Sequence, residues 1–205
     1  WRPLFAWFRI GQGRQAEDAR DLTQDLFVHL IESPLLARAD PGRGRFRTYL
    51  KACLGNFAAS AEEARRRVKR GGGQLLRSID AYLAEHVDVA IDPGADPAVA
   101  IDREWRRVLV ERALAALEEE LAGRGQAAEL DLFRAYHERC GLGDPPRTAY
   151  RELAERFALS RMRIAKILFR VRRRFRDVVY AQIRASVRDE ASAREECSDL
   201  FGAST

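Results

Sequence analysis

Residues 150–176 read YRELAERFALSRMRIAKILFRVRRRFR, and this stretch decides the fold class that the sequence predicts. Two short helical patterns meet there at a break around Ala158. In the second pattern, apolar residues recur at steps of three and four, as in a helix with one buried face. They are Ile164, Ile167, Leu168, Val171, Phe175 and Val178. The opposite face is basic and carries Arg163, Lys166, Arg170 and Arg173.

This arrangement predicts a helix-turn-helix whose second helix meets an anionic partner. Ser160 can cap that helix, because its hydroxyl accepts an N–H that the first turn leaves unpaired. Ala154 is small enough to let the two helices cross closely, and Ile164 is the expected apolar plug. Ala158 stands where a glycine would turn more easily, and a left-handed backbone there would cost about 1–2 kcal/mol. The alternative is an ordinary surface helix with a solvated basic face.

Charge is unevenly distributed, although the net charge of the 205 residues is only +5. Residues 147–177 contain eleven Lys and Arg against three acids, whereas residues 78–102 contain six acids and no Lys or Arg. A basic segment beside an acidic connector indicates a nucleic-acid partner at one end and a different partner in the middle.

Cysteine usage and hydropathy indicate a cytoplasmic protein without a membrane segment. Cys53, Cys140 and Cys197 are far apart and lack metal-ligand spacing, as expected of reduced thiols. No apolar run approaches the roughly 20 residues that span a bilayer, and no signal peptide is visible. No nucleophile–base pair, phosphate-binding loop or metal cluster appears, so we expect neither an enzyme nor a cofactor. The chain begins at Trp1, and we expect the natural N-terminus to lie upstream.

Residues 16–33 give the clearest amphipathic helix. Its apolar face contains Ala19, Leu22, Leu26, Phe27, Leu30 and Ile31. Its other face is acidic and contains Glu17, Asp18, Asp21, Asp25 and Glu32. An acidic face does not suit DNA. It is either a solvated surface or a docking surface for a basic protein partner.

Residues 45–70 predict a helix in which aromatic and basic side chains alternate and which ends in a basic run. Rings that stack on bases, together with cations that follow phosphates, suit single-stranded DNA. The alternative is that the rings belong to the core, which we expect for Phe46 and Phe57 and leave open for Tyr49.

In this order, the acid-faced helix, the aromatic-basic helix, the acidic connector and the helix-turn-helix resemble a bacterial sigma factor of the extracytoplasmic-function (ECF) class. The resemblance covers nearly the whole chain. The motifs that carry it are WRPLF (1–5), AEDARDLTQDLF (16–27), GRFRTYL (44–50), KRGGG (69–73) and the helix-turn-helix itself.

The resemblance implies an all-α fold of two helical domains, sigma region 2 and sigma region 4, joined by a flexible acidic linker. The implied boundaries are 1–70 for region 2, with about one helix missing upstream, 71–102 for the linker, 103–180 for region 4 and 181–205 for a C-terminal tail. It also implies a function: the chain would bind core RNA polymerase, through the β′ clamp and β flap, and direct promoter-specific initiation. The polymerase would supply the catalysis.

The resemblance also assigns roles to individual residues. Binding of the β′ clamp falls to Asp21, Gln24 and Asp25. The single-stranded −10 element falls to Arg47, Tyr49, Asn56, Arg65, Arg66, Arg67, Lys69 and Arg70. The duplex −35 element falls to Ser160, Arg161, Arg163, Lys166 and Arg170. Met162 and Arg163 replace small residues common in the family, so no promoter sequence is carried over.

Two other functions remain open from sequence. One is a plain helix-turn-helix regulator that binds duplex DNA as a dimer, although the acidic helix would then have no purpose. The other is a sigma-like adaptor that another protein recruits to DNA. The sequence leaves open whether an anti-sigma factor or a recruiting protein is a further partner.

Overall fold

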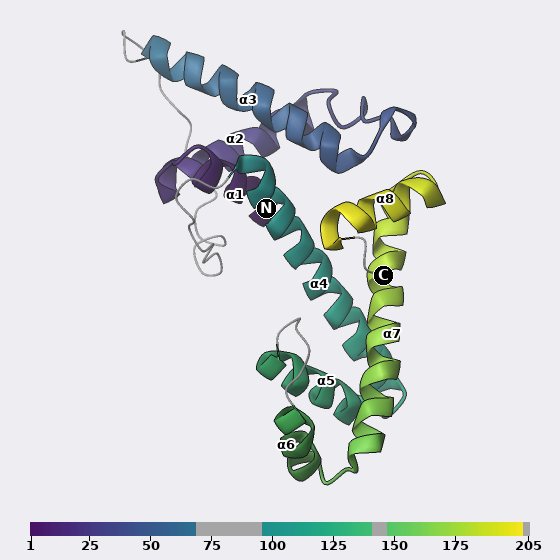
Figure 1. Ribbon diagram of the computed structural model, residues 1–205. Coiled ribbons are helices and arrows are strands. Elements are labelled where there is room, and N and C mark those ends of the chain that lie inside the picture. Colours follow the sequence, from purple (N-terminus) through teal and green to yellow (C-terminus); the bar gives the residue numbers. More distant parts are fainter. Residues whose placement is uncertain (69–95, 141–146, 203–205) are drawn as a thin grey trace. The chain divides into compact units, whose positions relative to one another are not determined.

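The computed structural model describes residues 1–68, 96–140 and 147–202, and within them every regular element is a helix (Figure 1). The predicted all-α class is confirmed for these residues. The elements are α1 (Arg2–Ala6), the π-helical turn η1 (Trp7–Gly11), α2 (Ala16–Glu32), the 3-10 turn η2 (Pro41–Arg43), α3 (Phe46–Val68), α4 (Pro97–Gly123), α5 (Ala127–Cys140), α6 (Arg147–Phe157), α7 (Arg161–Ala185) and α8 (Glu190–Phe201). None of the described helices combines the length and the apolar character needed to cross a membrane.

The chain divides into two compact units. The N-terminal unit comprises Trp1–Arg107 and Ser186–Thr205, and the helix-turn-helix unit comprises Val108–Ala185. The expected C-terminal tail therefore contains a complete helix, α8, which packs with the N-terminal unit although it follows α7 in the chain.

The core of the N-terminal unit is built from α1, η1, α2, α3 and the start of α4. Phe8 is fully buried and meets Phe57 edge-on, with ring centroids 6.1 Å apart. Burial is confirmed for Ala19, Leu22, Leu26 and Leu30 of the predicted apolar face of α2. Ile31 was expected on that face as well, but it is 75% exposed because it lies one step beyond the buried stripe.

Helix α4 begins at Pro97, whereas the sequence predicts a linker over 71–102 and the next helix from Arg103. Asp96 caps the helix by accepting the N–H of Ala98 at 2.8 Å, and proline is favoured in the first turn. Ala100 and Ile101 are buried in the N-terminal core. A methyl group on Gly11 would overlap Pro97, so this close approach requires a glycine. Residues 71–95 of the expected linker lie outside the described residues.

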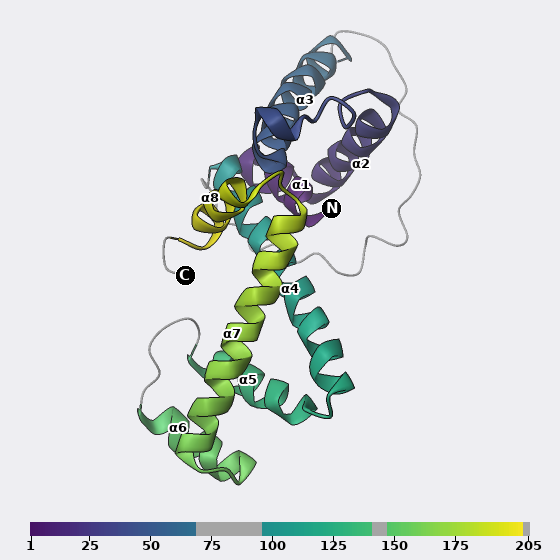
Figure 2. The ribbon, with the colours of Figure 1, turned by 90° about the vertical axis from the view of Figure 1, so that its right-hand side faces the viewer.

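Helices α5 and α6 flank the first half of α7 and form the core of the helix-turn-helix unit (Figures 1 and 2). The most deeply buried side chains there include Leu132, Tyr136, Leu153, Ile164 and Leu168. The ring of Phe175 packs beside Phe133 of α5, at 5.8 Å between centroids. Ile164 is fully buried and fills the space between the helices, as expected.

The turn between α6 and α7 follows the local sequence signals. Ala158 has a φ of +50°, so its backbone is left-handed, the conformation that would carry the steric cost given above. Ser160 caps α7 by accepting the N–H of Arg163 at 3.3 Å. The N–H of Leu159 bonds to the carbonyl of Ala154 at 3.1 Å and closes the end of α6. Helices α6 and α7 are thus joined by a short capped turn at the break that the sequence predicts.

Replacing Ala158 with glycine is expected to stabilise the protein by about 0.5–1 kcal/mol, because glycine adopts a positive φ without the steric cost that alanine carries. The measurement is the urea midpoint of unfolding. A matched control is Ala165→Gly, an exposed site within α7, where glycine is expected to cost about 1 kcal/mol. If both variants lose stability equally, the left-handed turn is not strained.

Candidate nucleic-acid interface

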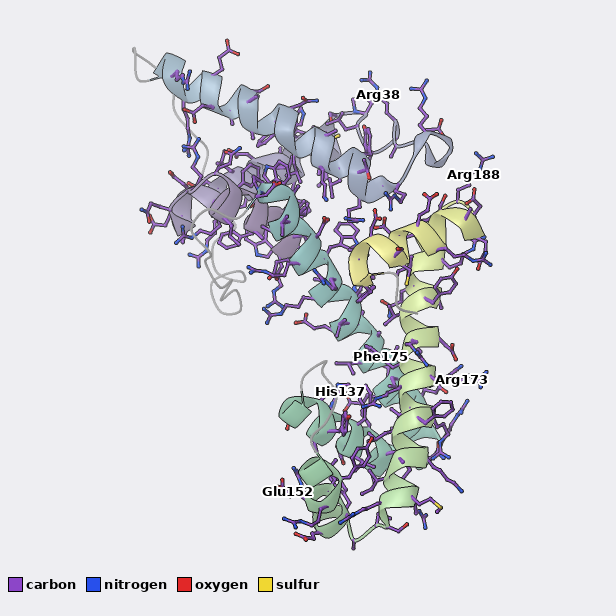
Figure 3. The ribbon with its side chains drawn as sticks, viewed as in Figure 1. Arg38, His137, Glu152, Arg173, Phe175 and Arg188 are labelled. Carbon is purple, nitrogen blue, oxygen red and sulfur yellow. The ribbon has the colours of Figure 1, made fainter. Side chains whose placement is uncertain are left out.

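The first turns of α7 present basic side chains to solvent. Arg161, Arg163 and Lys166 are all exposed, and Arg163 and Lys166 lie on the side of α7 away from the fully buried Ile164. We call these three residues the α7 surface. Met162 and Phe169 also stand out from α7, 71% and 66% exposed. Arg173 lies further along the helix, on the side that faces away from α5 (Figure 3).

The predicted contacts Ser160 and Arg170 already have partners within the unit. The oxygen of Ser160 accepts the capping hydrogen bond, which leaves its hydroxyl proton free to donate elsewhere. Arg170 pairs with Glu129 of α5, but its side chain is 57% exposed. An exposed ion pair of this kind contributes little, so a phosphate could displace it at small cost. Arg174 is also paired within the unit, and its hydrogen bonds to Glu120 raise its pKa above the ordinary value.

The outward side of α2 places two carboxylates beside apolar side chains. Asp21 and Asp25 are exposed and Gln24 is half-buried. Partial burial and the nearby charge of Asp21 raise the pKa of Asp25, and Arg65 opposes them. Val28 and Ile31, which are 51% and 75% exposed, follow Gln24 at steps of four and seven and so share its side of the helix. We call these five residues the α2 surface.

Sequence reasoning missed Val28 and Ile31 as members of the α2 surface. The spacing from Gln24 was the available signal, but Ile31 was placed with the core because it is apolar. Val28 and Ile31 together place two exposed apolar side chains on the same side of α2 as the acids.

The basic run at the end of α3 is described only in part. Arg65 pairs with Asp18 of α2 at 3.1 Å, and Arg66 pairs with Glu62 at 3.5 Å while remaining 72% exposed. The side chain of Arg67, and Lys69 and Arg70 with the rest of KRGGG, lie outside the described residues. Asn56 is exposed on α3, as a DNA contact requires.

Arg47 is buried in this structure, where a direct DNA contact would need an exposed side chain. It is only 5% exposed, and its guanidinium bonds to Glu196 of α8 at 2.6 Å and pairs with Asp102 of α4. Burial alone would lower the pKa of Arg47, but the hydrogen bonds to Glu196 and Asp102 outweigh it and raise the pKa above the ordinary value. Arg47 therefore remains charged and joins three helices of the N-terminal unit.

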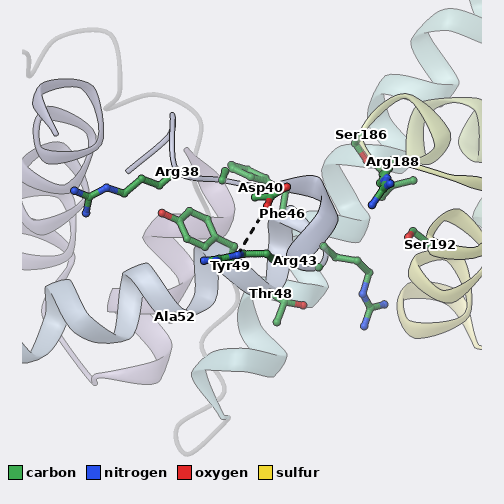
Figure 4. A pocket seen from close by; sticks show the side chains of 14 residues that line it. Arg38, Asp40, Arg43, Phe46, Thr48, Tyr49, Ala52, Ser186, Arg188 and Ser192 are labelled. Atoms are coloured by element: carbon green, nitrogen blue, oxygen red, sulfur yellow. Dashed lines mark ion pairs between the residues drawn. The ribbon is translucent and has the colours of Figure 1, made fainter. Parts of the chain in front are cut away.

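A cavity of about 460 Å³ lies beside the start of α3 (Figure 4). Phe46 and Tyr49 line it together with Arg38, Arg43 and Arg45, and the turn before α8 contributes Arg188. The hydroxyl of Tyr49 donates to the carbonyl of Leu35 at 2.8 Å, which holds the ring in place.

Phe46 is 38% exposed, so its expected place in the core is wrong, whereas Phe57 is packed against the core as expected. Phe46 is the first residue of α3 and lies at the edge of the unit, where its ring lines the cavity. The cavity combines ring faces with guanidinium groups, which is the chemistry that binds an unpaired nucleotide.

Comparison of the chain with protein-family models, with curated proteins and with solved structures gives no match. Within the described ranges, no three His, Cys, Asp or Glu side chains gather closely enough to bind a metal ion. The functional assignment therefore depends on the residues and geometry given above.

Proposed function

We propose that this chain is a sigma factor of the extracytoplasmic-function type, which binds core RNA polymerase and directs it to promoters. The observation that carries the proposal is the α7 surface: three exposed cations at the start of a capped helix, after a left-handed turn and above a buried plug. The proposed parts are region 2 in the N-terminal unit and region 4 in the helix-turn-helix unit.

The α7 surface would read the −35 element in duplex form. In helix-turn-helix proteins, the N-terminal residues of the second helix meet base edges in the major groove. Arginine and lysine at that position can bond to guanine, and each such contact contributes about 1–3 kcal/mol of discrimination. Arg170 and Arg173 lie further along α7, where they would meet phosphates.

The cavity beside α3 would hold an unpaired base of the −10 element. Taking a base out of the duplex costs a few kcal/mol, and stacking on an aromatic ring returns about 1–3 kcal/mol per base. Phe46 and Tyr49 supply the rings, and Arg38 and Arg43 supply charge for the phosphates. Asn56 lies further along the same helix.

The α2 surface would bind the β′ clamp of the polymerase. A combination of Asp21 and Asp25 with exposed Val28 and Ile31 suits a partner that presents both basic and apolar groups. This role gives the acidic helix a purpose that a plain helix-turn-helix regulator would not. The β flap and an anti-sigma factor are further proposed partners.

Size-exclusion chromatography of the purified chain with core RNA polymerase tests the proposal. Co-elution at equal stoichiometry supports the sigma-factor assignment. A free homodimer that ignores the polymerase and binds a palindromic duplex would instead support the plain regulator.

The double variant Arg163→Ala and Lys166→Ala is expected to reduce run-off transcription from a cognate promoter by at least about 30-fold, because each side chain contributes about 1–3 kcal/mol to duplex recognition. The control is Arg124→Ala with Arg134→Ala, which removes the same charge from the turn after α4 and from α5 of the same unit. Undiminished promoter-specific initiation in the first variant would favour the adaptor recruited by another protein.

A further inference from the structure

Helix α8 is held on the start of α3 by ion pairs between its acids and the arginines of the GRFRTYL motif. Arg45 lies 3.3 Å from Glu196 and 2.5 Å from Asp199. Arg47 lies 2.6 Å from the other oxygen of Glu196. We call Arg45, Arg47, Glu196 and Asp199 the α8 contact. It joins residues that are almost 150 positions apart, at the segment proposed to meet the −10 element.

Helix α8 also packs on the N-terminal unit through an apolar face and is capped at both ends. Its inner face buries Ala193, Cys197 and Leu200. Asp189 caps the helix by accepting the N–H of Ser192 at 2.9 Å, and Gly202 ends it with a φ of +83°. The charge of α8 is negative, because Glu190, Glu195, Glu196 and Asp199 outnumber Arg194.

The α8 contact uses groups that a DNA strand would also use. A carboxylate and a phosphate both bind a guanidinium through paired hydrogen bonds, so the two compete for the same arginine. Arg45 lines the cavity proposed to hold an unpaired base, and the turn before α8 lines it as well through Ser186, Val187 and Arg188 (Figure 4). Asp199 of α8 therefore holds a cation of the proposed −10 site.

Release of α8 would not leave the buried charge of Arg47 without a partner. Arg47 keeps its ion pair with Asp102 of α4, which is also paired with Lys51 at 2.6 Å. The outer part of the contact is open to solvent, since the side chain of Asp199 is 49% exposed and that of Arg45 is 24% exposed. A polyanion can thus reach Arg45 and displace Asp199 before the more deeply buried Glu196 leaves.

We propose that α8 is an autoinhibitory cover that competes with single-stranded DNA for Arg45 and Arg47. The proposal rests on the sigma-factor assignment, in which this surface meets the −10 strand. The free chain keeps the surface neutralised by its own carboxylates and therefore binds DNA weakly. Displacement of α8 exposes two additional guanidinium groups to the strand.

The test compares two double variants that carry the same change of net charge. Glu196→Gln with Asp199→Asn breaks the α8 contact, and Glu190→Gln with Glu195→Gln removes two exposed carboxylates of α8 outside that contact. The probe is fluorescein-labelled oligo(dT), whose binding to the full chain is measured by anisotropy over a range of salt concentrations. It needs neither polymerase nor a promoter sequence.

The contact-breaking variant is expected to bind oligo(dT) about 10-fold more tightly than the wild type at low salt. Its affinity should also fall more steeply with salt, by about 1.4 in the logarithmic slope, since two further phosphates are neutralised at about 0.7 each. The control variant should stay within about 2-fold of the wild type. Equal affinities for the two variants would overturn the cover.

A second variant and a hydrogen-exchange measurement test the proposal independently of whether the double variant folds. If the double variant does not fold, Asp199→Asn alone breaks the exposed pair with Arg45 and should tighten binding about 3-fold. Hydrogen exchange of α8 in the wild type should become faster when oligo(dT) binds, and unchanged or slower exchange would overturn the proposal. If the chain does not bind core polymerase, the sigma-factor assignment is wrong, but the oligo(dT) affinities and the hydrogen exchange of α8 still test the cover. Absence of oligo(dT) binding by all the proteins would overturn the cover and leave the polymerase assay to decide the function.

Discussion

Replacement of Asp21 and Asp25 by asparagine is expected to weaken binding of core RNA polymerase by about 100-fold. A carboxylate that becomes buried at an interface beside a basic partner typically contributes 1.4 kcal/mol or more, and each 1.4 kcal/mol is about a factor of ten in affinity. The neighbouring Val28 and Ile31 would exclude water from these contacts. The measurement is the dissociation constant for core polymerase, by fluorescence anisotropy of the labelled chain.

The same substitutions are expected to leave the fold intact or slightly more stable. Burial and Asp21 raise the pKa of Asp25, so the folded chain binds its proton more tightly than the unfolded chain does. The ionised carboxylate therefore opposes folding at neutral pH, and its unfavourable contribution disappears as the pH falls through the folded pKa. Because Asp25 is exposed, the gain from Asp25→Asn should be at most a few tenths of a kcal/mol.

If the Asp21→Asn with Asp25→Asn variant loses affinity for the polymerase but not folding stability, α2 carries a docking surface and not a merely solvated face. The control variant is Glu17→Gln with Glu32→Gln, which removes two exposed carboxylates from the ends of the same helix. It should change polymerase binding by less than about 3-fold. If Asp21→Asn with Asp25→Asn binds as the wild type does, the α2 surface is not where polymerase docks.

Substitution of Arg47 by methionine is expected to lower the free energy of unfolding by about 3–5 kcal/mol. Removing one partner of a buried ion pair leaves the other charge uncompensated, and Glu196 is only 4% exposed. Arg45 still lies 3.3 Å from Glu196, which favours the lower end of this range. The measurement is urea-induced unfolding followed by circular dichroism.

Two companion variants make this prediction specific to burial. Arg43→Met removes a guanidinium that is 89% exposed and should change stability by less than about 0.5 kcal/mol. Arg47→Met combined with Glu196→Met replaces the buried pair by apolar groups and should recover most of the loss. An Arg47→Met protein as stable as wild type would mean that α8 does not hold Arg47 in solution.

The turn between α6 and α7 could be predicted because its signals are local. The Ser160 cap, the strained Ala158 and the buried Ile164 depend on residues that are neighbours in the sequence, and each has a specific steric or hydrogen-bonding cause. The start of α4 also had a local signal, Asp96 followed by Pro97. This signal does not stand out, because the surrounding acids and prolines are typical of a linker.

The role of Arg47 could not be predicted, because its partner Glu196 lies 149 residues away and no periodic pattern joins them. The motif GRFRTYL reads as one basic-aromatic run, yet the fold separates its members. Arg45, Phe46 and Tyr49 line the cavity, while Arg47 points into the N-terminal unit. Only the packing of α8 on α3 distinguishes a structural arginine from one that can bind DNA.

The central claim is that this chain directs core RNA polymerase to specific promoters. In vitro transcription with core enzyme on a library of genomic fragments, followed by sequencing of the RNA 5′ ends, tests it most directly. The account predicts a discrete set of start sites that appear only when the chain is added and that share two upstream elements. Start sites that match those of core enzyme alone, or that share no upstream sequence, would contradict it.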